Sequence, residues 1–244
     1  MKIRLMVLSL LASALFATPL FAQSNNVVER GIACSVRDGY TINDVVSVMK
    51  GFEWSDETAP GVVIVREAVA ASGNFQFDWD FVMNFYYPSW ADMVEKRTAF
   101  RNRSGGTEGT RLRDVAVCGE RVRINNVWIA LQDADPIPDV APSMTLNCQL
   151  NGLSMSDAIA NAGNVRNFLG PEVRQSYVIS RGFGGPLIAQ NSQVGYRASF
   201  SSSADFGETL DRMTDNPQSA NPDNPQTCDV GGLWIDHLIF ARGG

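Results

Sequence analysis

The sequence predicts an α+β protein in which one β-α-β-β-α-β unit occurs twice. Three observations support this prediction. Apolar residues alternate with period two in some segments and follow helical spacing in others, four Ser/Thr-x-x-Asp segments recur at a fixed offset, and the cysteines recur at nearly the same offset. The chain has 244 residues, 45% of them hydrophobic and 19% charged, so it can bury a sizeable core and is not a disordered chain. Its net charge of −6 argues against nucleic acid as a partner, because nucleic-acid binders carry a basic face.

The first 22 residues are typical of a secretory signal peptide. Lys2 and Arg4 precede an apolar run from Leu5 to Phe16, and Ala22 places a small residue before a polar segment. The alternative is an uncleaved anchor, but the apolar run is short for a span of about 20 residues. We therefore expect export to the periplasm or the extracellular space, no membrane span after cleavage behind Ala22, and oxidised cysteines.

The first half begins with a predicted strand, a helix and a second strand. Val27–Val36 is rich in apolar and β-branched residues and ends at a turn with Gly39. Thr41 then caps a helix through Lys50, whose apolar residues recur at i, i+3, i+4 and i+7. Gly61–Ala68 is the second strand.

The third predicted strand has one face of large apolar side chains and one polar face. Its large residues are Phe75, Phe77, Trp79, Phe81, Met83 and Phe85, which alternate with Asn74, Gln76, Asp78, Asp80, Val82 and Asn84. A second helix begins at Ser89, residues 101–110 form a loop, and Val122–Leu131 is the last strand of this half.

Helix caps and cysteines indicate an internal duplication. The four Ser/Thr-x-x-Asp segments begin at Thr41, Ser89, Ser154 and Ser202; each pair is 48 residues apart, and the pairs are offset by 113. Cys34 and Cys148 are 114 apart, and Cys118 and Cys228 are 110 apart. The second half repeats the order of elements at Thr145–Leu150, Ser154–Phe168, Ser176–Arg181, Leu187–Phe200, Ser202–Met213 and Gly232–Ala241. We therefore divide the chain into a signal peptide (1–22), a first repeat (23–135), a Pro/Asp linker (136–142) and a second repeat (143–244).

The β-α-β-β-α-β order resembles the ferredoxin-like unit, in which two right-handed crossovers give strand order 4-1-3-2 with both helices on one face. Two such antiparallel sheets whose bare faces meet resemble the dimeric α+β-barrel superfamily, here as a pseudo-dimer within one monomeric chain. The resemblance covers nearly the whole mature chain, but only as element order, and no family motif is present. The superfamily includes small monooxygenases, haem-handling proteins, isomerases and proteins without known activity.

The ferredoxin-like order also selects a disulfide pairing. Four cysteines allow three connectivities. Because strands one and four are neighbours in 4-1-3-2 order, we expect Cys34–Cys118 and Cys148–Cys228, one bridge in each half.

If the bare faces meet, the polar face of the third strand points into the barrel. Asp78, Asp80 and Asn84 would then be buried and would need partners, of which Arg66 is one candidate, with Arg181 and Arg197 at comparable places in the second half. Aromatic residues near the end of this strand could stack on a ligand: Tyr86, Trp90, Trp54 and Tyr87. These residues define a candidate small-molecule site, the alternatives being a solvated strand face, a structural ion pair and ordinary core packing.

Signals for catalysis are weak. The only histidine, His237, lies on a predicted strand, where it is a general base, a haem ligand or a packed residue with one hydrogen-bond partner. One histidine and four oxidised cysteines leave no zinc set, and residues 215–227 lack the alternating acidic pattern of a calcium loop, so neither a metal nor another cofactor is expected.

Three functions follow as alternatives. The first is a secreted, disulfide-stabilised protein that binds a small apolar or aromatic ligand between the repeats. The second is a cofactor-independent monooxygenase or isomerase of the dimeric α+β-barrel type, with His237, Asp80, Asp78 and Arg66 as its polar set. The third is an extracytoplasmic interaction or assembly domain.

Overall fold

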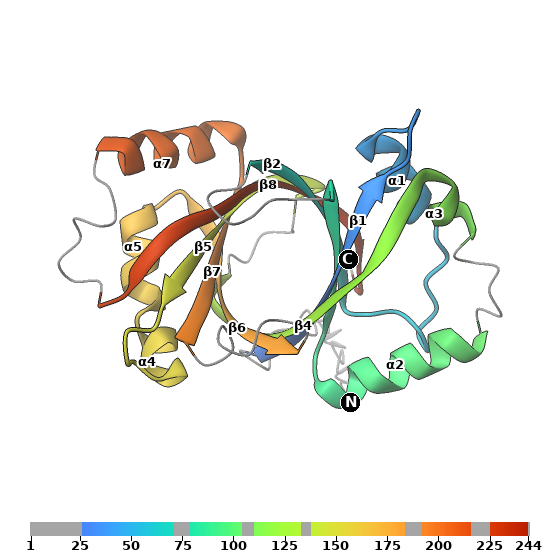
Figure 1. The fold of residues 1–244 in the computed structure, drawn as a ribbon, viewed down its shortest axis with the longest axis horizontal. Coiled ribbons are helices and arrows are strands. Elements are labelled where there is room, and N and C mark those ends of the chain that lie inside the picture. The colour runs from blue at the N-terminus through green and yellow to red at the C-terminus, as the bar shows by residue number, and fades with distance from the viewer. Residues whose placement is uncertain are drawn as a thin grey trace, which may run out of the picture.

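The computed structural model describes residues 26–70, 79–103, 110–132, 138–183, 192–215 and 225–243. Within them, eight antiparallel strands close into one barrel, and helices lie outside it (Figure 1). The strands are β1 (Asn26–Val36), β2 (Val62–Ala70), β3 (Phe81–Tyr87), β4 (Ala116–Gln132), β5 (Val140–Gln149), β6 (Val173–Phe183), β7 (Gln193–Phe200) and β8 (Thr227–Ala241). The helices are α1 (Ile42–Lys50), α2 (Trp90–Arg103), α3 (Thr110–Val115), α4 (Met155–Ala160), α5 (Ala162–Leu169) and α7 (Ser203–Asp215).

The barrel runs in the order β1-β3-β2-β8-β5-β7-β6-β4. Strands β4-β1-β3-β2 form one half and β8-β5-β7-β6 the other, so each half has the expected 4-1-3-2 order. The halves are joined at both edges, where β2 pairs with β8 and β4 pairs with β6. Joining the edges leaves no edge strand exposed and gives both halves one shared interior.

Helices cover the barrel on two opposite sides. Figure 1 shows α1, α2 and α3 beside the first half and α4, α5 and α7 beside the second. The predicted N-terminal caps are present: Thr41 and Ser154 form complete capping boxes, and Ser89 and Ser202 accept from the backbone N–H three residues on. A capping box satisfies donors that the first turn of a helix otherwise leaves free, which is why these residues mark the helix starts.

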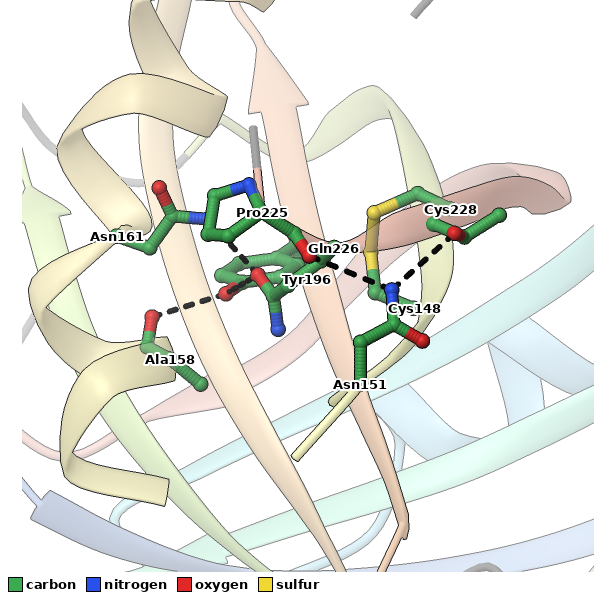
Figure 2. Close-up of a disulfide and its surroundings, with 9 residues drawn as sticks. Cys148, Asn151, Ala158, Asn161, Tyr196, Pro225, Gln226 and Cys228 are labelled. Carbon is green, nitrogen blue, oxygen red and sulfur yellow. Dashed lines mark hydrogen bonds between the residues drawn. A yellow bond between two sulfur atoms is a disulfide. The ribbon is translucent and has the colours of Figure 1, made fainter. Parts of the chain in front are cut away.

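Both expected disulfides are present, each between the first and last strands of its half. Cys34 pairs with Cys118 across β1 and β4, and Cys148 pairs with Cys228 across β5 and β8. Figure 2 shows the second bridge beside a polar contact between a strand and a helix. The Tyr196 hydroxyl on β7 lies 2.9 Å from the Ala158 carbonyl oxygen of α4 and 2.6 Å from the Gln226 amide oxygen. This contact fixes α4 against the sheet.

Each strand is apolar on two faces because the barrel has both an inner and an outer surface. The outer face of the second half carries the largest core, which includes Phe200, Leu169 and Met144. The outer face of the first half carries another, around Phe81 and Val45. A smaller apolar cluster lies inside the barrel, with Val127 fully buried in it. No helix in the described ranges is long and apolar enough to span a membrane.

Several boundaries differ from the sequence prediction. Residues 110–115, expected to be loop, form α3, and the helix expected at 154–168 divides at Asn161 into α4 and α5. The expected linker 136–142 is wrong at its C-terminal end, because β5 begins at Val140 and pairs with β8 through Pro142. The regular part of the third strand starts only at Phe81. Residues 71–78, with the predicted start of that strand, lie outside the described residues.

Candidate functional site

A polar cluster occupies the barrel interior and joins the two halves. The Arg197 guanidinium on β7 donates from Nη1 to Oε2 of Glu29 on β1 over 2.7 Å, and it also donates to the Tyr86 hydroxyl on β3. Tyr86 donates in turn to the same Glu29 oxygen over 2.8 Å. The amide of Asn125 on β4 donates to the other Glu29 oxygen over 3.1 Å. All four side chains are buried.

The electrostatics of this cluster hold Glu29 ionised. Burial acts to raise the pKa of its carboxyl, but the charge and hydrogen bond of Arg197 outweigh burial and lower that pKa to about 2. Burial also raises the pKa of the Tyr86 hydroxyl well above its ordinary value, so the phenol stays protonated and donates to Glu29. The cluster is therefore a fixed ion pair, not a proton-transfer site near neutral pH.

A second buried ion pair crosses between the halves at the β2–β8 edge. Arg66 donates from Nε and Nη2 to the two carboxylate oxygens of Asp236, both over 2.7 Å. The indole of Trp234 lies 5.6 Å from the guanidinium carbon of Arg66. The expectation that Arg66 would pair with a carboxylate of the third strand is wrong, because β8 lies on the other side of β2 and supplies Asp236.

The space left inside the barrel is small. A cavity of about 60 Å³ lies between the two ion pairs and the apolar residues Val27, Val62 and Ile64. Pockets for small organic molecules usually measure about 300–1,000 Å³, whereas a water needs only about 10–15 Å³ by this measure. The interior therefore has room for a few waters, and its polar groups serve mainly to join the halves.

The predicted site residues are only partly brought together. Asn84, Tyr86 and Arg197 meet inside the barrel, as expected for the polar face of β3. Asp80 does not: it is exposed just before β3, where it accepts from the Val36 backbone N–H over 2.7 Å. Burial of Asp80 was therefore a wrong expectation, because the strand starts after it.

The remaining predicted site residues do not join this cluster. Trp90 lies on the outer side at the start of α2, where its indole N–H donates to the Asn126 amide oxygen over 2.9 Å. Asp78 and the side chain of Arg181 lie outside the described residues.

His237 is a packed residue with a carboxylate partner. Its Nε2 lies 3.1 Å from Oε2 of Glu67 on the neighbouring strand β2, and it lines neither of the two cavities described here. Since this is the only histidine and the cysteines are in disulfides, the chain does not fit a haem bound through imidazole or thiolate. Within the described ranges, no group of three His, Cys, Asp or Glu side chains is placed to hold a metal ion.

A larger cavity lies on the outer face of the first half, between the sheet and helices α1, α2 and α3. It measures about 360 Å³ and is called the outer pocket below. Its described lining residues come from three strands, three helices and the α1–β2 connection: Arg30, Ile32, Met49, Phe52, Trp54, Thr58, Pro60, Met83, Phe85, Tyr87, Arg97, Phe100, Leu112, Arg113, Ala116 and Cys118. The volume is within the usual range for a small organic ligand.

Aromatic rings form the apolar walls of the outer pocket. The Trp54 ring centroid lies 4.6 Å from that of Phe52 and 6.4 Å from that of Phe85, which meets it edge-on. Phe100 of α2 lies 6.1 Å from Phe52 and extends the wall. Such tilted and edge-on rings make a rigid surface on which a planar ligand can stack.

The polar part of the outer pocket is cationic. The Arg30 guanidinium lies 6.0 Å from the Phe85 ring centroid, and that of Arg97 lies 5.5 Å from the Phe100 ring centroid. Partial burial and the nearby charge of Arg97 lower the pKa of Arg30 to about 10. Burial raises the pKa of the Tyr87 hydroxyl, and the charges of Arg97 and Arg30 oppose that rise. Arg30, Arg97 and Tyr87 therefore share one charged region of the pocket.

Sequence reasoning found only part of this pocket. Trp54 and Tyr87 were among the aromatic candidates, and both line it. Arg30 was missed, because on a strand of Val, Ile and Ala it has the pattern of an ordinary alternating charge. A useful signal was its parity: Arg30 shares a strand face with Val28, Ile32 and Cys34, which are core positions.

Comparison with protein-family models gives no match, and comparison with curated protein sequences gives none either. Solved structures do match over almost the whole chain. An anthrone oxidase-like protein is 13% identical with TM-score 0.50, covering 91% of this chain and 98% of its own. A provisionally assigned monooxygenase from Fusobacterium nucleatum subsp. nucleatum is 8% identical with TM-score 0.50, covering 90% and 95%.

The chain has the dimeric α+β barrel fold. This agrees with the resemblance inferred from element order. Identities near 10% establish the fold alone, so the chemistry of this α+β barrel has to be argued from its own side chains.

Proposed function

We propose that this protein binds a small, mostly apolar aromatic molecule in the outer pocket. The observation that carries the proposal is a cavity of about 360 Å³ walled by Phe52, Trp54, Phe85 and Phe100. The sequence placed the ligand inside the barrel, between the halves. The interior cavity of about 60 Å³ is too small for that, so the proposed site moves to the other face of the same sheet.

Binding of N-phenyl-1-naphthylamine, a neutral aromatic amine whose fluorescence rises in apolar surroundings, tests this proposal. We expect one saturable site per chain. Leu112→Trp places a larger ring in the pocket from α3 and should abolish binding. Val140→Trp adds the same ring at a half-exposed position on β5, away from both cavities, and should leave binding unchanged. Absence of saturable binding, or equal binding by both variants, would refute the proposal.

A cofactor-independent oxygenase is the second candidate, favoured by the fold shared with proteins described as monooxygenase and anthrone oxidase-like. The described lining residues include no Asp, Glu or His, so a proton acceptor would have to come from the substrate or from Tyr87. Oxygen uptake with anthrone, giving anthraquinone and water without added metal or cofactor, tests this candidate. Uptake that Leu112→Trp abolishes would favour the oxygenase over simple binding, and no uptake would remove it.

We also propose that the barrel consists of two tandem ferredoxin-like repeats, 23–135 and 143–244, and that the protein is exported. The shared strand order of the two halves and the equivalent position of each disulfide support the duplication. Disulfides persist mainly in oxidising compartments, which supports export.

A further inference from the structure

We propose that the ligand of the outer pocket is an aromatic carboxylate whose charged group is bound by Arg30 and Arg97. This inference rests on the proposed function and specifies the class of ligand. It follows from the charge balance of the pocket, from donors that have no partner, and from a comparison of the two halves.

The charge of the outer pocket is not balanced by its described residues. Its lining contributes three arginines, Arg30, Arg97 and Arg113, and none of the described lining residues is acidic. The ion pairs found among the described residues include none of the three. The two interior arginines, in contrast, each have a carboxylate partner. The outer pocket thus differs from the interior in lacking a counter-ion from the protein.

Two buried donors of the outer pocket are also unsatisfied. Nη1 of Arg30 and Nε1 of Trp54 are buried without a hydrogen-bond acceptor. An unpaired buried donor destabilises the folded chain, so such donors in a cavity point to a ligand that supplies acceptors. Both groups are donors only, which matches a carboxylate or another oxygen-rich acceptor and does not match an amine.

The second half shows what the same positions contain when no pocket is present. The bridged Cys34 and Cys148 are equivalent, so Arg30, four residues earlier on β1, corresponds to Met144 on β5, which is fully buried in the core. The capping residues Ser89 and Ser202 are likewise equivalent, so Arg97 corresponds to Leu210. Both arginines of the outer pocket therefore replace apolar residues of a packed core.

The position of each guanidinium indicates how the ligand lies. Arg30 stands over Phe85 and Arg97 over Phe100, at 6.0 Å and 5.5 Å from the ring centroids. The charged groups thus lie against the aromatic wall. A planar ring can stack on Trp54 and Phe52 while its carboxylate reaches both guanidinium groups.

Isothermal titration calorimetry with 2-naphthoate and with 2-naphthamide, which have the same rings and nearly the same shape, tests the inference. We expect the wild type to bind the carboxylate at least about tenfold more tightly than the amide, a ratio that corresponds to about 1.4 kcal/mol. Arg30→Met and Arg97→Leu copy the second half and should each bring the two affinities within about threefold. Arg101→Met, at an exposed position of the same helix α2, should keep the wild-type ratio.

Thermal unfolding of each variant provides the control for folding. Arg30→Met should keep or raise the midpoint, because it removes a buried unpaired charge, whereas a purely structural arginine would lower it. Equal binding of both compounds by the wild type would overturn the carboxylate assignment while leaving the proposed binding function intact. Binding of neither compound would overturn both. An unchanged ratio in Arg30→Met and Arg97→Leu would overturn the role of the arginines.

Discussion

Glu29→Gln is the substitution that most directly tests how the two halves of the barrel are held together. Glu29 is 3% exposed and accepts from Arg197, Tyr86 and Asn125, which come from three other strands. Glutamine has nearly the same size but no charge. Arg197 would then remain buried without its counter-ion, although little volume is lost.

The expected cost follows from two independent arguments. The pKa of Glu29 falls from its ordinary 4.5 to about 2, and at about 1.4 kcal/mol per pKa unit this corresponds to about 3 kcal/mol of stability at pH 7. Removing one partner of a buried ion pair typically costs about 3–5 kcal/mol. We therefore expect Glu29→Gln to lower the free energy of unfolding by about 3 kcal/mol.

Urea unfolding with the disulfides intact, measured from pH 7 down to pH 2.5, is the assay. Because folding depresses this pKa, the stability that the carboxylate contributes is present above about pH 4.5 and is lost as the pH falls toward 2. The difference between wild type and Glu29→Gln should therefore shrink over that interval. Glu95→Gln, at an exposed position on α2, should change stability by less than about 0.5 kcal/mol.

Either of two results would refute this reasoning. One is a loss below about 1 kcal/mol at pH 7, which would mean that the ion pair contributes little beyond the packing around it. The other is a loss that stays constant down to pH 2.5, because a cost independent of the ionisation of Glu29 would have to come from altered hydrogen bonding.

Three further predictions concern the disulfides, a helix cap and the N-terminus. Cys34→Ser with Cys118→Ser opens a bridge between residues 84 apart and should lower the free energy of unfolding by about 4 kcal/mol, measured by urea unfolding. Ser154→Ala removes a capping box from α4 and should cost about 1 kcal/mol, seen as a lower thermal midpoint. Exported protein should begin at Gln23, read by N-terminal sequencing; a chain that retains Met1 would refute signal cleavage.

The order and the pairing of the strands could be predicted from the sequence because local signals mark them. Thr41 and Ser154 bond to the backbone of their own helices, so the segments that contain them show where each helix starts whatever packs around it. Once the order β-α-β-β-α-β is known, handedness leaves few arrangements, and the cysteine pairing follows from the strand neighbours.

The location of the site could not be predicted because alternation separates two faces of a strand without showing which face borders a void. The polar face around Asn84 was taken as the site, and in the structure its groups pair across the barrel with Arg197 and Tyr86. The void lies on the apolar face, beside a connection that carries Phe52 and Trp54 and has no regular secondary structure. Only the packing of the helices fixes the size of that space.

The division of roles between the halves follows from where stability is located. Two buried ion pairs and the interior apolar cluster join the halves, and the outer face of the second half carries the largest core, with Met144 and Phe200 fully buried. These interactions leave the outer face of the first half free to carry groups that cost stability. Unpaired donors on Arg30 and Trp54 are such groups, and a cost of this kind is typical of binding sites in otherwise well-packed proteins. If that is the reason for the hollow, substitutions that fill it should stabilise the chain and remove ligand binding together.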